Sequence, residues 1–398
     1  MQNTSNDLLA RAGIAPGNGT TVVVAMSGGV DSSVAAALLH EHGYRVIGIT
    51  LNLWDYHTSG GNVNFESGCC SIDTMADARA VCHRLGVPHY VLDLKEVFQR
   101  SVQQNFIAEY FAGRTPNPCV RCNTHIKWGA LLQQAEAIGA DLLATGHYAR
   151  LTQNPGSRRW ELRRAVDLNK DQSYALWGVR QQALSRTLFP LGELIKPEVR
   201  SLAHSLGLKT AHKKESQEIC FIPDNDYRRF LRENAAAAGW QVGTGMFFDA
   251  AGNALGTHQG VPFYTIGQRK GLGLALGRPV FVTHIDAQTN AITVSDGQDL
   301  LQEEFTVTAV NWVSEVCPPD GRTVVCKIRY RDPGAPALLL DATERSVRVR
   351  FVSPQRAITP GQSAVFYDGD VVIGGGVIEA VVPIKHATQQ FHTQANQS

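Results

Sequence analysis

A short apolar run that leads straight into a glycine turn and a helix constrains this chain more than any other feature. Residues 22–26 (VVVAM) read as a buried parallel strand, because three valines stand in an unbroken apolar run. The turn SGGVDSS (27–33) follows at once, and residues 34–40 (VAAALLH) are typical of a helix. A glycine turn at a helix N-terminus lets backbone N–H groups approach a bound anion, and phosphate suits such a site best. The sequence therefore predicts a phosphate-binding loop in an α/β domain.

This loop differs from the two commonest phosphate-binding motifs. It lacks the Gly-Lys-Ser/Thr of a Walker A loop and the G-x-G-x-x-G spacing of a dinucleotide fold. A loop that offers hydroxyls and N–H groups but no lysine suits a pyrophosphate that leaves as a unit, with a metal ion supplying the positive charge. SGGVDSS resembles the PP-loop of ATP pyrophosphatases, which adenylate a substrate and release pyrophosphate. The alternative is an ordinary glycine-rich turn between a strand and a helix.

The other apolar segments divide the chain into an α/β half and a β-rich half. In the first half, strands are expected at 46–53, 89–94 and 141–144, and helices at 73–85, 97–110 and 132–137. This alternation predicts an open parallel sheet with helices on both faces and with ligands beyond the carboxyl ends of its strands. In the second half, strands are expected at 243–248, 262–266, 280–285, 291–294, 306–312, 323–331, 337–340, 347–352, 363–367 and 371–381. These short runs predict two small β-rich modules, the last a β-barrel.

Changes of composition along the chain set the expected boundaries. They are a flexible N-terminus (1–19), a PP-loop domain (20–223), a small central β domain (224–288), a C-terminal barrel (289–385) and a disordered tail (386–398).

Composition favours a cytoplasmic protein with no membrane contact. No apolar run approaches the ~20 residues of a membrane span, and the polar first 20 residues lack the apolar core of a secretory signal. Eight cysteines in so long a chain argue against a disulfide framework and favour catalytic, metal-binding or buried thiols. The net charge is +1, so a surface that binds nucleic acid would have to concentrate its basic residues locally.

Two cysteines stand in a proline-rich segment, residues 115–123 (TPNPCVRCN). Cys119 and Cys122 form a C-x-x-C pair, and two prolines in three residues predict a stiff, non-helical loop around them. Neighbouring cations such as Lys127, and a helix beginning at Asn123, would lower a thiol pKa. The chain has no second C-x-x-C, which argues against a four-cysteine zinc site.

A third cysteine, Cys220, stands in ESQEICFI (215–222). Alone it would be typical of a small buried apolar residue. Beside a PP-loop and a C-x-x-C pair it suggests a sulfur relay, in which one cysteine carries a persulfide and another resolves it by forming a disulfide.

Alternating basic residues mark two of the expected strands in the second half. They are Lys327, Arg329 and Arg331 in TVVCKIRYRD (323–332), and Arg348 and Arg350 in the next-but-one strand. Such faces suit a nucleic-acid backbone, but solvated strand faces that resist edge pairing carry the same pattern. Spacing alone leaves both interpretations open.

Six motifs in this order resemble those of tRNA-specific 2-thiouridylases, over roughly residues 20–385. They are SGGVDSS, TPNPCVRCN, TGHYAR (145–150), KDQSYAL (170–176), ESQEICFI and GxHxGxxxxTIGQRKGLG (256–273). The resemblance implies that ATP and Mg²⁺ adenylate the C2 oxygen of the wobble uridine in tRNA. A persulfide sulfur from an upstream donor protein then replaces this oxygen, which gives 2-thiouridine, AMP and pyrophosphate.

The resemblance also implies a role for each matching residue. ATP would be bound by Ala25, Met26, Ser27, Gly28, Gly29, Val30, Asp31 and Ser32, with Leu51 and Gly146 at the adenosine. The target base would face Asn117, Pro118 and Cys119. Cys122 would be the nucleophile and Cys220 the persulfide carrier, and the two would form a disulfide after sulfur leaves. In the barrel domain and before it, tRNA would contact Lys170, Asp171, Gln172, Arg329 and Tyr330.

Two positions depart from the family pattern. Many members have Asp, a candidate acid/base, where this chain has Cys119, and Met where it has Leu51, a volume-conserving exchange. Cys119 also permits a different interpretation, in which Cys119, Cys122 and Cys220 hold a [4Fe–4S] cluster with one open iron site. Two other function classes stay open: a tRNA-binding protein without sulfur chemistry, which leaves the three cysteines unexplained, and a PP-loop ligase for a small molecule, which leaves the basic β modules unexplained.

The remaining candidates receive structural interpretations. Packing is expected for Cys69, Cys70, Cys82, Cys317 and Cys326, and solvated charge for Arg228-Arg229 and Lys213-Lys214. His147 and His258 are expected to be either ligand contacts or hydrogen-bonded structural groups.

Overall fold

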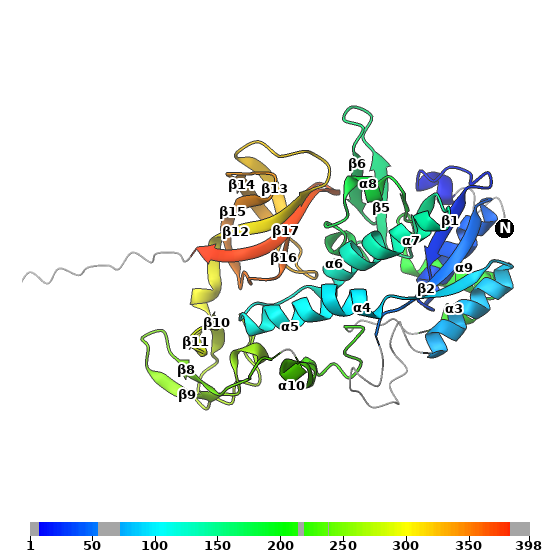
Figure 1. The fold of residues 1–398 in the computed structure, drawn as a ribbon. Coiled ribbons are helices and arrows are strands. Elements are labelled where there is room, and N and C mark those ends of the chain that lie inside the picture. Colours follow the sequence, from blue (N-terminus) through cyan, green and yellow to red (C-terminus); the bar gives the residue numbers. More distant parts are fainter. Residues whose placement is uncertain (1–7, 55–71, 214–218, 238, 383–398) are drawn as a thin grey trace, which may run out of the picture.

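Five parallel strands form the sheet at the centre of the N-terminal domain (Figure 1). The computed structural model describes residues 8–54, 72–213, 219–237 and 239–382. The strand order is β3-β2-β1-β4-β7, and every neighbouring pair is parallel. The strands are β1 (Thr21–Ala25), β2 (Arg45–Asn52), β3 (His89–Asp93), β4 (Leu142–Ala144) and β7 (Thr187–Leu188). The predicted open parallel sheet is confirmed, whereas the two-residue strand β7 is too short to show any periodicity in the sequence.

Helices cover both faces of this sheet, as predicted. Along β1, Val22 and Val24 belong to one hydrophobic core and Val23 to another, because successive side chains of a strand point to opposite faces. The first core contains residues of α2 (Val30–Glu41), α3 (Ile72–Leu85) and α9 (Lys196–Ser205). The second contains residues of two longer helical segments, α4 (Lys95–Phe98) with η1 (Gln99–Gln103) and α5 (Gln104–Phe111), and α6 (Pro118–Arg121) with η2 (Cys122–Leu131) and α7 (Leu132–Ala137).

The central module is a four-stranded sheet with the order β10-β11-β8-β9. It contains β8 (Gly245–Phe248), β9 (Ala254–His258), β10 (Phe281–Asp286) and β11 (Ala291–Ser295), and α10 (Tyr227–Ala237) precedes it. The strand predicted at 262–266 is wrong, because Val261–Phe263 form a short 3₁₀ helix, η5. Pro262 has no N–H for a ladder, and Gly260 turns the chain with a φ of 121°.

The C-terminal module is a closed barrel, as predicted. Six strands follow the order β12-β15-β14-β13-β16-β17, and pairing between β12 and β17 closes the ring. They are β12 (Leu301–Trp312), β13 (Arg322–Lys327), β14 (Ala335–Leu340), β15 (Ser346–Arg356), β16 (Ser363–Asp368) and β17 (Val371–Val382). Short helices connect the elements elsewhere: η3 (Ser173–Ala175), α8 (Gln181–Leu184), η4 (Lys209–His212) and η6 (Gln298–Leu300).

The strand predicted at 323–331 ends early, at Lys327. The Asp332 carboxylate accepts hydrogen bonds from the N–H groups of Ile328 (2.9 Å) and Gly334 (3.0 Å), and these bonds stabilise a turn in place of further strand. Arg329 and Arg331 therefore do not share a strand face with Lys327, which corrects the expected alternation.

A hairpin from the first half of the chain extends the barrel sheet. Strand β6 (Trp160–Arg164) pairs with β5 (Ala149–Gln153) on one side and with β17 of the barrel on the other. Asp370, in the β16–β17 turn, accepts hydrogen bonds from Arg150 (2.5 Å) and Arg163 (3.1 Å). The two halves of the chain are thus joined through a shared sheet. The domain boundaries expected from the sequence remain predictions.

Buried hydrogen bonds also join the first half of the chain to barrel strand β16. The Tyr174 hydroxyl donates to the Ser363 carbonyl oxygen (2.8 Å), and the indole of Trp177 donates to the Ser363 hydroxyl (3.0 Å). Tyr174 is 1% exposed, and burial raises the pKa of its hydroxyl well above the usual range.

Within the described residues, no helix is long and apolar enough to cross a bilayer.

Replacing Tyr174 with Phe tests this junction. Tyr174→Phe removes a buried hydrogen bond between the two halves, so we expect the free energy of unfolding to fall by about 1–2 kcal/mol. Tyr90→Phe is the matched control, because Tyr90 is 58% exposed and should change stability by less than about 0.5 kcal/mol. Denaturant unfolding measures both, and equal losses in the two variants would show that the Tyr174 bond stabilises nothing.

Candidate functional site

The predicted phosphate loop follows the carboxyl end of β1 and opens helix α2. Gly28 has a φ of +67°, and a Cβ there would lie 2.1 Å from the carbonyl oxygen of Thr74, so the turn requires glycine. The Ser32 hydroxyl contacts the backbone N–H of Ser27 (3.2 Å) and the carbonyl oxygen of Gly29 (3.2 Å). Ser32 therefore stabilises the turn from within, in addition to the ATP contact predicted for it.

The end of β4 lies directly against this loop. A Cβ on Gly146 would lie 2.7 Å from the carbonyl carbon of Asp31 and from the backbone nitrogen of Ser32. Strands β1 and β4 are parallel neighbours, so Ala25 and Gly146 reach the same edge of the sheet, and the end of β2 places Leu51 at that edge too. These residues, all predicted to bind ATP, thus meet at one edge of the sheet.

Two lysines from later in the chain reach the loop. Lys196, at the start of α9, places its Nζ 2.6 and 2.9 Å from the two carboxylate oxygens of Asp31. Lys213 donates to the carbonyl oxygen of Gly28 (3.1 Å) and to Asp77 (2.7 Å), so it does not fit the solvated role expected for it. Lys214 lies outside the described residues. No local motif marks either lysine, because both meet the loop only through the fold.

A histidine after β4 connects the loop to the cysteine-bearing helix. Lys127 Nζ lies 2.9 Å from Asn123 Oδ1 and 3.4 Å from Nε2 of His147. An ammonium can only donate, so Nε2 accepts, the proton sits on Nδ1, and Nδ1–H faces the Thr145 hydroxyl at 2.7 Å. Burial, and then the Lys127 charge, lower the pKa of His147 well below its usual value. His147 is thus a neutral structural link.

Cys119 and Cys122 lie in a helix and not in the predicted non-helical loop. Helix α6 begins at Pro118, and the Asn117 side chain accepts a hydrogen bond from the N–H of Val120 (3.4 Å) as its N-cap. Proline is tolerated at the first helical position because its missing N–H has no intrahelical partner there. Cys119 is exposed in the first turn, and Cys122 is half-buried where η2 begins.

The residues next to Cys220 and Cys122, Phe221 and Arg121, contact the same helical segment, α4 to α5. Phe221 packs edge-to-face on Phe98 (5.5 Å between ring centroids) and Phe106 (5.3 Å), on α4 and α5. Arg121 donates to the carbonyl oxygen of Ser101 (2.7 Å), in η1 between those two helices. That Cys122 and Cys220 react with each other remains a prediction.

The described residues give no support to a metal centre. No group of three or more His, Cys, Asp or Glu side chains among them is arranged to hold a metal ion, and Cys119, Cys122 and Cys220 are all described. Burial raises the pKa of Cys82 to about 11 and that of Cys326 well above its usual value, as expected of packed thiols. Cys317 is exposed, so the packing predicted for it is wrong. Cys69 and Cys70 lie outside the described residues.

Among the residues expected to contact tRNA, Tyr330 lies beside Tyr174 of the α/β domain. The Tyr330 ring lies 6.1 Å from the Tyr174 ring and is 45% exposed. Asp171 accepts hydrogen bonds from Ser173, and Gln172 accepts one from the N–H of Tyr148 (3.0 Å), so these two side chains shape the loop that carries Lys170. Contact of these residues with tRNA remains a prediction.

Arg329 and the basic face of β15 are engaged within the protein. Arg329 donates to the carbonyl oxygen of Ala357 (2.6 Å). Arg348 and Arg350 pair with Glu304 on the adjacent strand at 2.9 and 2.7 Å, and their hydrogen bonds lower the pKa of that carboxyl. The ion pairs favour a structural role for this strand face over contact with a nucleic-acid backbone.

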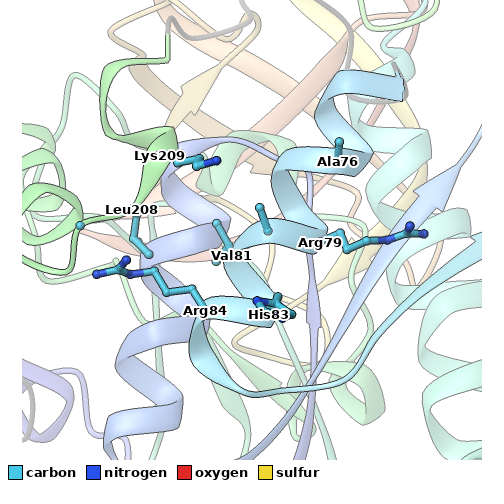
Figure 2. Close-up of a pocket in the computed structure, with 9 residues that line it drawn as sticks. Ala76, Arg79, Val81, His83, Arg84, Leu208 and Lys209 are labelled. Carbon is cyan, nitrogen blue, oxygen red and sulfur yellow. The ribbon is translucent and has the colours of Figure 1, made fainter.

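A separate pocket of about 520 Å³ opens beside α3 (Figure 2). Arg79, His83 and Arg84 from α3 and Lys209 from η4 surround it, and Arg84 donates to the carbonyl oxygen of Leu206 (2.9 Å). None of the residues predicted to act on ATP, the target base or tRNA lines this pocket.

His258 is a structural residue of the central module, because it is 3% exposed and accepts a hydrogen bond from the N–H of Gly260 (3.0 Å).

Comparison with known proteins gives matches along nearly the whole chain. Three family models match: a tRNA methyl transferase HUP domain over 20–224, a tRNA methyl transferase PRC-barrel domain over 233–296 and an aminomethyltransferase beta-barrel domain over 302–378. A tRNA-specific 2-thiouridylase MnmA from Salinibacter ruber is 51% identical over 90% of this chain and 94% of its own length. Proteins of the same name from Amoebophilus asiaticus (51% identity, 90% and 95%) and Heliobacterium modesticaldum (50%, 92% and 94%) match equally well.

Solved structures match more distantly. A 4-thiouridine synthetase–RNA complex with bound ATP matches 54% of this chain and 50% of its own chain at 16% identity, with a TM-score of 0.34.

Gly28→Ala tests the close contact between the loop and Thr74. Gly139→Ala is the matched control, because Gly139 has a similar φ of +75° but open space around it. In both variants, left-handed backbone strain should lower the free energy of unfolding by about 1–2 kcal/mol. Gly28→Ala should lower it further, because its Cβ meets Thr74, and should also abolish ATP binding. Denaturant unfolding and calorimetric ATP titration measure this, and ATP binding as tight as that of the wild type would refute the assigned loop geometry.

His147 gives a pH-dependent prediction. Its pKa is lowered on folding, so the unfolded chain takes up the proton first as pH falls. The stability that neutral His147 provides is complete above about pH 6.5 and is lost as pH falls toward its lower folded-state pKa. His147→Gln should therefore flatten the fall in unfolding free energy between about pH 7 and pH 5, whereas the same change at exposed His40 should leave the slope intact. Identical slopes in all three proteins would contradict the neutral assignment.

Proposed function

The chain belongs to the tRNA-specific 2-thiouridylase family, and we propose that it transfers sulfur to C2 of the wobble uridine of tRNA through an adenylated intermediate and a cysteine persulfide. As a member of this family it is a tRNA sulfurtransferase. The finer steps below are our proposal, and they draw on the arrangement of its loop, histidine and cysteines.

One set of contacts supports the proposal above the others. Gly146 lies against the first turn of α2, and the next residue, His147, contacts Lys127 on the helix that carries Cys122. Gly146 and His147, which follow β4, thus connect the proposed ATP loop to the helix that carries the proposed nucleophile. A nucleotide bound at the sheet edge and a base held at Cys122 would then be neighbours, as transfer of the adenylyl group requires.

In the first step, the uridine O2 attacks the α-phosphorus of ATP and pyrophosphate leaves, which makes the oxygen a leaving group. The loop residues from Ala25 to Ser32, with Leu51 and Gly146, would bind the nucleotide. Mg²⁺ fits as an ion held mainly by the phosphates, because the loop offers a single carboxylate, Asp31. The ion would neutralise charge on the departing pyrophosphate.

In the second step, the outer sulfur of a Cys220 persulfide attacks C2 and AMP departs. The Cys122 thiolate then attacks the Cys220 sulfur, which releases 2-thiouridine and leaves a Cys122–Cys220 disulfide. An external dithiol must reduce this disulfide, and an upstream persulfide donor must reload Cys220. Cys119, with Asn117 and Pro118, would face the base and serve as its acid/base group.

The tRNA would lie across the junction of the two halves. Its proposed contacts are Lys170, Asp171 and Gln172 from the α/β domain and Arg329 and Tyr330 from the barrel. Tyr330 lies beside Tyr174 at this junction, and its exposed ring offers a stacking surface. Because tRNA is the substrate in this proposal, we also expect a cytoplasmic location.

Single-turnover thiolation of tRNA with ATP and persulfide-loaded enzyme tests the proposal. Cys122→Ser and Cys220→Ser should each lower the rate by roughly 10³-fold or more, because Cys220 carries the persulfide and the Cys122 thiolate releases the product. Exposed Cys317→Ser is the matched control and should keep the wild-type rate. Cys122→Ser should also accumulate a tRNA–Cys220 disulfide that thiol reductants release.

Full activity in both cysteine variants would overturn the sulfur relay. Loss of activity in Cys119→Ala, together with loss of visible absorption after anaerobic iron–sulfur reconstitution, would replace it with the cluster mechanism. ATP–pyrophosphate exchange with a small metabolite in the absence of tRNA would favour a ligase.

A further inference from the structure

The pocket beside α3 combines buried apolar side chains with exposed basic ones (Figure 2). Val81 and Leu208 line it and are only 2% and 3% exposed, so they form its base. The exposed basic side chains around them are Arg79, His83, Arg84 and Lys209, from α3 and η4. None of the described residues that line the pocket is Asp or Glu, so no carboxylate balances this charge within the lining.

This concentration of positive charge is local, because the net charge of the whole chain is only +1. Arg79 and Lys209 make no ion pair with a carboxylate of the described residues. Asp77, on the same helix as Arg79, is already paired with Lys213 (2.7 Å). A basic surface with an apolar centre and no internal counter-charge is complementary to an acidic partner that also offers apolar side chains.

The pocket lies far from the surface proposed for tRNA. Figure 1 shows α3 and the barrel at opposite sides of the molecule, with the central parallel sheet toward the side of α3. The proposed tRNA contacts lie where the α/β domain meets the barrel, at Tyr330 and Tyr174. A partner at α3 would therefore leave those contacts open, and the charge complementarity of this pocket is best explained by a partner other than tRNA.

One wall of the pocket leads along the chain to Cys220. Helix η4 carries Lys209, and Lys213 follows it and donates to Asp77 on α3 (2.7 Å) and to the carbonyl oxygen of Gly28 (3.1 Å). Cys220 comes seven residues after Lys213 and is half-buried. Seven residues span at most about 25 Å, and a standard protein interface covers about 800 Å² of each partner. A protein anchored at the pocket thus has the reach to meet Cys220.

We propose that the pocket beside α3 is the docking surface for the upstream persulfide donor, and that it receives an acidic segment of that protein with an apolar side. The inference rests on the proposed use of a Cys220 persulfide. Once the donor is docked, the Cys220 thiolate attacks the outer sulfur of the donor persulfide. A new S–S bond forms on Cys220, the S–S bond of the donor breaks, the proton stays on the transferred sulfur, and the donor leaves as a thiolate.

Loading of Cys220 by matched persulfides tests this docking surface on the full chain. The probes are an amphipathic Glu/Leu peptide with one cysteine persulfide, the same peptide with Lys in place of each Glu, and the small neutral persulfide of N-acetylcysteine methyl ester. The variant is Arg79→Gln/Lys209→Gln. Arg11→Gln/Arg45→Gln is the matched control, because both arginines are exposed and neither lines the pocket. Mass spectrometry of the fragment that contains Cys220 measures the loading rate.

In the wild type at low salt, the acidic peptide should load Cys220 about 10-fold faster than the basic peptide, because opposite charge speeds encounter. Arg79→Gln/Lys209→Gln should lose most of this preference, whereas the Arg11→Gln/Arg45→Gln control should keep it. The neutral persulfide needs no docking, so it should load every variant within about twofold of the wild-type rate. The charge reversal Arg79→Glu/Lys209→Glu should prefer the basic peptide.

Each other outcome decides against the inference. Equal loading by the two peptides in the wild type would overturn it and would leave the proposed function intact, because Cys220 would still receive the sulfur. Slower loading of Arg79→Gln/Lys209→Gln by the neutral persulfide would indicate that the substitutions disturb Cys220 itself. Loss of tRNA binding with unchanged loading would assign the pocket to an RNA backbone, and binding of inorganic phosphate that only this variant loses would assign it to a small anion.

Two further results keep the test decisive. If the double variant fails to fold, exposed Lys209→Gln alone takes its place, and an unchanged preference for the acidic peptide there would count against the docking surface. If no probe places a persulfide on Cys220 of the wild type, the proposed function itself is overturned.

Discussion

The close approach of β4 to the first turn of α2 is the constraint on which the site depends. Gly146 lies so near Asp31 and Ser32 that any side chain there would push the two elements apart. Parallel pairing of β1 with β4 sets this approach, because it brings both carboxyl ends to one edge of the sheet. The loop, the histidine after β4 and the helix with Cys122 take their relative positions from this contact.

Charged and polar side chains pack around that contact and link it to the rest of the molecule. Asp31 holds Lys196 and the Tyr148 hydroxyl, and the backbone N–H of Tyr148 bonds to Gln172. The neighbouring Ser173 hydroxyl lies 3.1 Å from the hydroxyl of Tyr367 in the barrel. Hydrogen bonds between residues that are neighbours in the chain or in space therefore lead from the proposed ATP loop to the barrel, through the loop expected to meet tRNA.

The sequence predicted features whose cause is local and missed those whose cause is tertiary. Strand β1, its glycine turn and α2 follow from valines, glycines and alanines in immediate succession, and the structure confirms the α/β fold they predict. The helix at Pro118 was missed because two prolines read as a loop, although a proline at the first helical position is compatible with a helix. Lys196 was missed because 165 residues separate it from Asp31 and only the fold joins them. The role of the basic face of β15 could not be decided from the sequence, because its acidic partner, Glu304, lies on another strand.

The segment before the cysteine helix shows how the barrel bears on the chemistry. Thr115 donates its N–H to the carbonyl oxygen of Pro360 (2.9 Å), and Gln362 donates to the carbonyl oxygens of Thr115 (3.1 Å) and Pro116 (3.0 Å). The Thr115 hydroxyl also contacts Thr265 of the central module (3.3 Å). Prolines limit the N–H groups of this segment, so its carbonyl oxygens supply most of its bonds to the barrel. All three modules thus meet two residues before Asn117 caps the helix, and a shift of the barrel on binding RNA would move the start of the helix that carries Cys119 and Cys122.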